Sequence, residues 1–191
     1  MPDHIVRTIY FEQAGEDNTD QTLRLARERA ENLGIRHIVV ASTTGETGVR
    51  AAREFSGYNL TVVTHSTGFK APNIQELTPE NRELLEHLGA KILTHQHAFG
   101  GIGRAVRRKL GTYQLDEIIA FTLRTLGQGL KVACEITLMA ADAGCIPTGQ
   151  PVIAIGGTGR GADTAAVILS VNAQDFFDLR IMEIICKPRS W

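Results

Sequence analysis

Apolar and polar positions follow two different periods along this chain. Short apolar runs rich in β-branched residues, at 36–42, 60–65, 90–95 and 151–157, are typical of buried strands. Stretches in which apolar residues recur every three or four positions predict helices at 18–34, 46–55, 79–89, 101–111, 114–127 and 129–144. Strands that alternate with helices form βαβ units with right-handed crossovers. The pattern therefore predicts a mainly parallel sheet that is covered on both faces.

The two ends of the chain depart from this alternation. The β-branched and aromatic run at 4–11 predicts a first strand before the first helix. Near the other end, the strand-like runs 164–171 and 180–188 follow one another without a helix between them. We therefore expect the final segment to return as an antiparallel edge of the sheet.

Composition narrows the class of protein. The 191 residues are 43% hydrophobic and 21% charged, which fits one soluble domain over 1–191. A net charge of −1 gives no electrostatic support for nucleic-acid binding, and no apolar run approaches the roughly 18 residues of a membrane span. The first residues lack a secretory pattern, and Cys134, Cys145 and Cys186 lack metal-site spacing. We expect a cytoplasmic protein with reduced thiols. The sequence does not decide between a monomer and a homo-oligomer.

A loop rich in glycine and hydroxyl groups follows the second predicted strand. Glycines let the backbone approach a phosphate, and the amides that open the next helix supply donors. The negative charge of Glu46 opposes a phosphate unless it faces away or meets sugar-like hydroxyls. The alternative is a turn in which a serine or threonine only caps the helix. The candidate residues are Ser42, Thr43, Thr44, Gly45, Glu46, Thr47 and Gly48.

Three further loops follow parallel strands and therefore fall at the same edge of the predicted sheet, where α/β proteins bind ligands. The first contributes His65, Gly68 and Phe69, and an aromatic ring there can stack on a planar ligand. Another of these loops follows 151–157 and is either an anion-binding loop that carries one guanidinium group or only a glycine-rich hairpin loop. Its candidate residues are Gly157, Thr158, Gly159, Arg160, Gly161, Asp163 and Thr164.

The remaining candidates carry open alternatives. The segment 100–106 approaches a dinucleotide fingerprint but has Val106 at the third glycine position. His95 and His97 could share a metal, although no third ligand lies nearby in sequence. Glu135 shares a helical stripe with Lys131 and Asp142, which is either the exposed edge of a buried helix or a carboxylate facing a ligand. Arg104 belongs to a solvated helix face or leans toward a phosphate.

Residues 36–69 and 151–171 resemble the C-terminal domain of pyruvate kinase. The whole chain is similar to small stand-alone prokaryotic proteins that keep this domain, most specifically in "GLKVACEITLMAADAG" (129–144) and "RGADTA" (160–165). The resemblance implies an α/β fold, a three-layer α/β/α sandwich with a mostly parallel mixed sheet of five strands. It also implies no kinase activity, because the kinase's catalytic residues belong to a barrel that this chain lacks.

The same resemblance implies a ligand at the carboxyl edge of the sheet. In allosteric pyruvate kinases the matching loops hold the phosphates of a sugar bisphosphate. Carried over, Thr43, Thr44, Gly45 and Thr47 would bind one phosphate, and Arg160 and Gly161 would line the same pocket. In the stand-alone group the ligand is flavin mononucleotide (FMN), whose hydroxylated chain suits Glu46. We expect the protein to bind a phosphorylated small molecule, FMN above all, and to act as a flavin-dependent oxidoreductase if it is an enzyme. The alternatives are a non-catalytic sensor of a phosphorylated metabolite and a metal-assisted hydrolase.

Overall fold

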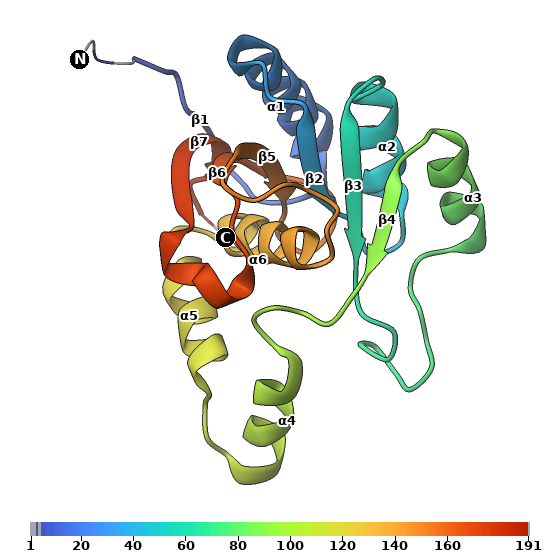
Figure 1. The fold of residues 1–191 in the computed structure, drawn as a ribbon, viewed down its shortest axis with the longest axis vertical. Helices are drawn as coiled ribbons and strands as arrows, with labels where there is room; N and C mark the ends of the chain where they lie inside the picture. The colour runs from blue at the N-terminus through green and yellow to red at the C-terminus, as the bar shows by residue number, and fades with distance from the viewer. Residues whose placement is uncertain (1–2, 4, 191) are drawn as a thin grey trace.

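The computed structural model describes residue 3 and residues 5–190. Within those residues seven strands form one sheet in the order β1-β7-β6-β5-β2-β3-β4. Strand β6 runs antiparallel to both of its neighbours, and every other pairing in the sheet is parallel. The carboxyl ends of β2, β3, β4 and β5 therefore lie along one edge (Figure 1).

The elements follow the predicted alternation closely. The strands are β1 (Ile9–Phe11), β2 (His37–Ala41), β3 (Asn59–Thr64), β4 (Lys91–Thr94), β5 (Pro151–Gly156), β6 (Thr164–Leu169) and β7 (Arg180–Pro188). The α-helices are α1 (Thr19–Leu33), α2 (Glu46–Glu54), α3 (Pro79–His87), α4 (Gly101–Leu110), α5 (Leu115–Arg124) and α6 (Gln128–Asp142). Two short 3₁₀ helices are also present: η1 (Glu16–Asn18) overlaps the start of the helix predicted at 18–34, and η2 (Ala173–Asp178) lies where the sequence predicted no helix.

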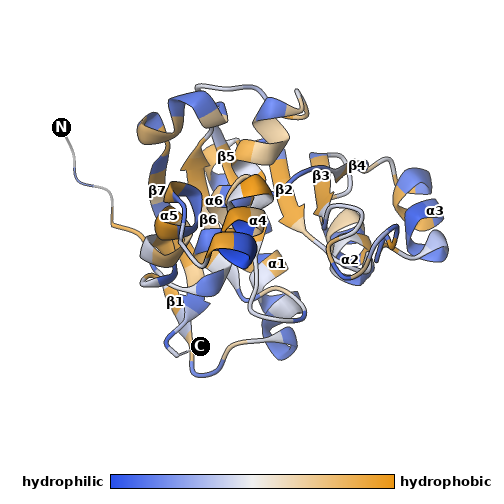
Figure 2. Ribbon diagram, turned by 90° about the horizontal axis from the view of Figure 1, so that it is seen from below, coloured by the Kyte–Doolittle hydropathy of each residue, from blue (hydrophilic) through white to orange (hydrophobic). Residues whose placement is uncertain are grey.

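The central strands are apolar on both sides because helices cover both faces. Ile38 and Val40 of β2 pack on the face of α1, α2 and α3, whereas Val39 between them packs on the face of α5 and α6. Figure 2 shows the apolar central strands lying between helices of mixed polarity. Alternate residues of one strand serve two cores, which explains why the runs read as continuously hydrophobic.

Two expectations about the sheet need correction. β7 does return antiparallel to β6, but β1 pairs with its other side, so the last segment is not an edge strand. The sheet also has seven strands where the resemblance implied five. Only Ile9–Phe11 of the predicted first strand is paired, and His4 lies outside the described residues.

Helix α4 has no buried residue and projects from the body of the sandwich (Figure 1). No helix in the described part of the chain has the length and apolar character needed to cross a membrane.

Candidate functional site

The loop at residues 42–48 lies at the centre of the carboxyl edge. β2 pairs with β3 on one side and with β5 on the other, so this loop has residues 65–69 and residues 157–163 as neighbours. The topology thus brings together three of the loops that the sequence singled out.

The backbone of residues 42–48 is held tightly against the start of α3. The Thr44 carbonyl accepts hydrogen bonds from Asn81 Nδ2 at 2.9 Å and from the Thr78 amide at 3.2 Å. Gly45 has φ +100°, and a Cβ there would lie 2.4 Å from the Cβ of Asn81. Only glycine fits this conformation and this gap.

In the first turn of α2, some backbone amides remain free to donate hydrogen bonds. The Ser42 hydroxyl accepts the Gly48 amide at 3.0 Å, so Ser42 acts as an internal cap and is buried. The amides of Glu46 and Thr47 have no acceptor among the described residues. The positive end of the helix dipole lies at these amides, and exposed Thr44 precedes them in the chain. This turn can bind an anion.

The loop at residues 157–163 is organised by one buried carboxylate. Asp163 accepts hydrogen bonds from the amides of Gly15 at 3.0 Å and Thr158 at 3.1 Å, and from the Thr164 hydroxyl at 2.8 Å. Asp163 and Thr164 are fully buried, and a Cβ on Gly157 would meet the Gly161 carbonyl at 2.3 Å. These residues shape the loop, so they are not its exposed donors.

Gly159 and Arg160 form the exposed tip of that loop. The Arg160 guanidinium has no hydrogen bond or ion pair with any described residue. This exposed charge belongs to a loop that neighbours residues 42–48, because β5 pairs with β2. The Thr158 hydroxyl is buried and also lacks a partner within the described residues.

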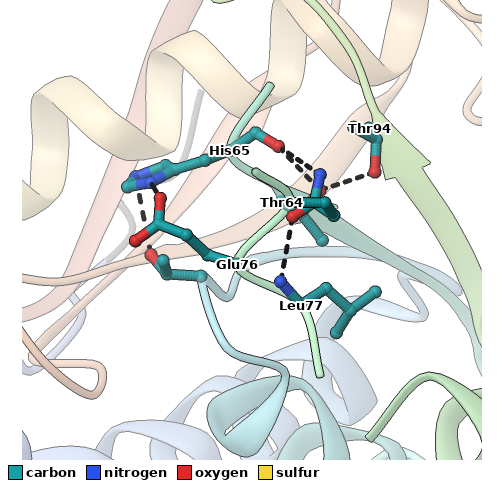
Figure 3. A network of polar contacts seen from close by, with 7 residues as sticks. Thr64, His65, Glu76, Leu77 and Thr94 are labelled. Atoms are coloured by element: carbon teal, nitrogen blue, oxygen red, sulfur yellow. Dashed lines mark hydrogen bonds and ion pairs between the residues drawn. The ribbon is translucent and has the colours of Figure 1, made fainter. Parts of the chain in front are cut away.

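His65 is held by the loop that joins β3 to α3 and by the turn before α2 (Figure 3). Its Nδ1 lies 2.8 Å from Glu76 Oε2, and its Nε2 lies 3.5 Å from Thr43 Oγ1. The His65 carbonyl accepts hydrogen bonds from the Thr64 hydroxyl at 3.1 Å and from Gln75 Nε2 at 3.0 Å. The imidazole therefore stands in a fixed position beside residues 42–48.

The Phe69 ring is already packed by polar neighbours. Its centroid lies 4.1 Å from that of His65 and 4.9 Å from that of His97, and Arg104 Cζ stands 4.7 Å above it. A planar ligand that stacks on Phe69 has to displace one of these groups. Arg104 therefore contacts this aromatic ring and is not wholly solvated. Gly68 has a positive φ and makes the turn that precedes Phe69.

Glu135 and Lys131 form a buried ion pair in α6, so the interpretation of this stripe as an exposed edge is wrong at both residues. Their side chains are 5% and 9% exposed, and Lys131 Nζ lies 2.5 Å from Glu135 Oε2. Burial alone would raise the pKa of Glu135, but the polar contact with His97 and the charge of Lys131 outweigh burial and lower that pKa to about 2. Burial lowers the pKa of Lys131. Only Asp142 lies at an exposed end of the stripe, where it accepts the Ala173 amide at 3.0 Å.

His97 joins this pair and does not join His95. Its Nδ1 lies 3.7 Å from Glu135 Oε1, while His95 is exposed and its Nδ1 contacts the Gln96 carbonyl at 3.1 Å. His97 Nε2 is buried without a partner among the described residues. In that part of the chain no group of three or more His, Cys, Asp or Glu side chains is arranged to hold a metal ion.

Sequence reasoning missed Glu76 and the contact of His97 with Glu135. Glu76 lies eleven residues after His65, and no spacing rule connects the two through an irregular loop. The strand-end positions of His65 and His97 were the available signal, because they placed both rings at the ligand edge.

The solved structures that resemble part of this chain include pyruvate kinases. A pyruvate kinase from Cryptosporidium parvum is 14% identical, with a TM-score of 0.41, over 80% of this chain and 22% of its own. The same organism's pyruvate kinase in complex with ADP is also 14% identical, with a TM-score of 0.41, over 78% of this chain and 24% of its own. The chain thus spans less than a quarter of the length of these kinases.

The family comparison covers most of the chain. Residues 20–168 match the family described as pyruvate kinase, alpha/beta domain, and this stretch begins within α1 and ends within β6. The match spans every loop at the carboxyl edge discussed above. The chain belongs to the pyruvate kinase alpha/beta domain family.

Proposed function

We propose that this protein binds a phosphorylated small molecule at the carboxyl edge of its sheet. One observation carries the proposal: the first turn of α2 presents the amides of Glu46 and Thr47 without acceptors in the described structure. Helix N-termini with free amides are favourable sites for phosphate. Exposed Thr44 lies in the same turn and its hydroxyl adds a neutral donor, whereas the Thr43 hydroxyl faces His65 Nε2.

The neighbouring loop supplies a positive charge to this site. Exposed Arg160 has no ion-pair partner among the described residues, and its loop lies beside residues 42–48 because β5 pairs with β2. The exposed carboxylate of Glu46 stands in the same turn and opposes a dianion. A ligand with one phosphate and hydroxyl groups beside it suits this combination better than a bisphosphate.

FMN is the ligand that we propose, and its two halves fit differently. The phosphate and its hydroxylated chain fit the amides and hydroxyls of residues 42–48. The flavin ring can reach Phe69 only if it displaces His65, His97 or Arg104 from that ring. A bound flavin would supply redox chemistry, while the protein binds the phosphate and orients the ring. Binding without catalysis, as a sensor of a phosphorylated metabolite, remains the alternative proposal.

Calorimetric titration with FMN, and separately with inorganic phosphate, tests this proposal. Arg160→Gln should weaken the binding of both by about fivefold, or roughly 1 kcal/mol, because one charge-assisted contact is lost at an exposed site. Glu46→Gln should strengthen binding, because it removes a repelling charge. Arg53→Gln, at the far end of α2, is the matched control and should leave binding unchanged.

Binding of neither ligand at millimolar concentration would overturn the proposal. So would binding that responds to Arg53→Gln as strongly as to Arg160→Gln. Binding of phosphate without binding of FMN would retain the anion site and reject the flavin.

A further inference from the structure

A carboxylate, an imidazole and a hydroxyl lie in a line in space at the carboxyl edge of the sheet. Phosphate binding does not explain this arrangement. Glu76 Oε2 contacts His65 Nδ1 at 2.8 Å, and His65 Nε2 faces Thr43 Oγ1 at 3.5 Å. His65 and Glu76 lie near opposite ends of the connection between β3 and α3, and Thr43 lies in the turn before α2. Two separate segments therefore converge on one line of polar atoms.

The contact with Glu76 fixes the tautomer of His65. A carboxylate at Nδ1 accepts the Nδ1 proton, so neutral His65 leaves the lone pair of Nε2 toward the Thr43 hydroxyl. Thr43 then donates its proton to Nε2. We propose that Thr43, His65 and Glu76 act as nucleophile, general base and orienting carboxylate in acyl transfer from carboxylic esters to water.

The backbone around Thr43 suits this role. Thr43 stands where β2 gives way to α2, and the open amides of Glu46 and Thr47 follow it in the same turn. Such amides stabilise the oxyanion of a tetrahedral intermediate. Nucleophiles placed on strand-to-helix turns use the same arrangement in other α/β enzymes.

Each step conserves protons and electron pairs. Thr43 Oγ bonds to the ester carbonyl carbon, its proton passes to His65 Nε2, and the carbonyl π pair becomes the oxyanion on the α2 amides. When the intermediate collapses, the ester C–O bond breaks and Nε2 returns the proton to the departing alcohol. A water molecule then repeats both steps on the acyl-Thr43, which releases the carboxylic acid and restores the hydroxyl.

The three side chains are accessible and held in place. His65 and Glu76 are 32% and 20% exposed, and Thr43 is partly exposed, so an ester can reach the hydroxyl. Gln75 fixes the backbone on both sides of Glu76, because it donates to the His65 carbonyl at 3.0 Å and accepts the Leu77 amide at 2.9 Å. The long Nε2 to Oγ1 distance is usual for catalytic contacts without substrate.

Hydrolysis of p-nitrophenyl acetate by the full chain, in buffer without phosphate, tests the inference. Acetylated protein is trapped at low pH and mapped by peptide mass spectrometry. We expect an acetyl group on Thr43, and we expect Thr43→Val and His65→Gln each to lower kcat/KM by at least about a hundredfold. Glu76→Gln should lower kcat more than it raises KM, and Thr43→Ser should retain acetylation.

Two matched controls separate the triad from general surface reactivity. Thr112→Val removes an exposed hydroxyl between α4 and α5, and His95→Gln removes an exposed imidazole outside the triad; both variants should hydrolyse the ester like the unsubstituted protein. Acetyl groups on lysines alone, or full activity in folded Thr43→Val, would overturn the inference. If Thr43→Val fails to fold, then loss of acetylation in folded Glu76→Gln supports the triad and its retention at the original rate refutes it.

Discussion

Acidification should reveal the buried pair of Glu135 and Lys131 as a pH-dependent part of the stability. The Glu135 carboxyl is 5% exposed, and its contacts with His97 and Lys131 favour the ionised form in the folded state. The folded-state pKa is about 2, whereas the ordinary value is 4.5. A carboxyl group with a lowered folded-state pKa stabilises the fold above its unfolded pKa, and that stabilisation is lost as the pH falls toward the folded-state value.

The size of the effect follows from these two pKa values. Each pKa unit corresponds to about 1.4 kcal/mol, so the difference amounts to about 3 kcal/mol of unfolding free energy. Nearly all of it should disappear between pH 5 and pH 2. Exposed carboxylates titrate in the same range, so the contribution of Glu135 has to be isolated by substitution.

Urea unfolding of the unsubstituted protein and of Glu135→Gln over that pH range provides the measurement. The amide cannot ionise, so the unfolding free energy of the variant should fall by about 3 kcal/mol less. The substitution leaves Lys131 without its carboxylate, which costs stability at neutral pH. Glu135→Gln combined with Lys131→Met removes that cost and should keep the shallow pH dependence. Parallel curves for the unsubstituted protein and both variants would refute the reasoning.

Two other predictions concern thiols and one glycine. Burial raises the pKa of Cys134 and of Cys186 to about 12. A disulfide reagent at pH 8 should therefore react with one thiol in the folded protein, that of the partly exposed Cys145, and with all three thiols in guanidinium. Three reactive thiols in the folded protein would contradict this packing. Gly45→Ala should lower the unfolding free energy by about 2–4 kcal/mol, because its Cβ would meet Asn81 at a positive φ. Gly57→Ala has a positive φ but open space around it, and should cost about 1 kcal/mol; equal losses in urea unfolding would refute the steric argument.

The elements were predictable because their signal is local. Apolar periodicity placed β2, α2 and β3 within about one residue of their observed bounds. The shared edge of the loops was also predictable, since parallel strands all end on the same side. The pairing of β1 with β7 could not be predicted, because it joins the two ends of the chain and no short segment carries a signal for it.

Side-chain partners were less predictable than positions. Asp163 was expected at a ligand, but its carboxylate binds the amides of Gly15 and Thr158, and the first of these lies 148 residues away. The burial of Glu135 depends on residues 95–100, which cross α6 beside this carboxylate. Within that segment the Phe99 amide donates a hydrogen bond to Glu135 Oε1 at 3.0 Å. A helical stripe reports spacing along one helix and carries no information about the loop that crosses it.

The two proposals share the amides of Glu46 and Thr47, and this sharing is itself testable. One set of amides cannot hold a phosphate and an ester oxyanion together, so inorganic phosphate should inhibit ester hydrolysis competitively. Its inhibition constant should equal the dissociation constant from calorimetry, and Arg160→Gln should raise both by the same factor of about five. Arg53→Gln should change neither. Ester hydrolysis that is indifferent to saturating phosphate would separate the two sites and place the oxyanion on other donors.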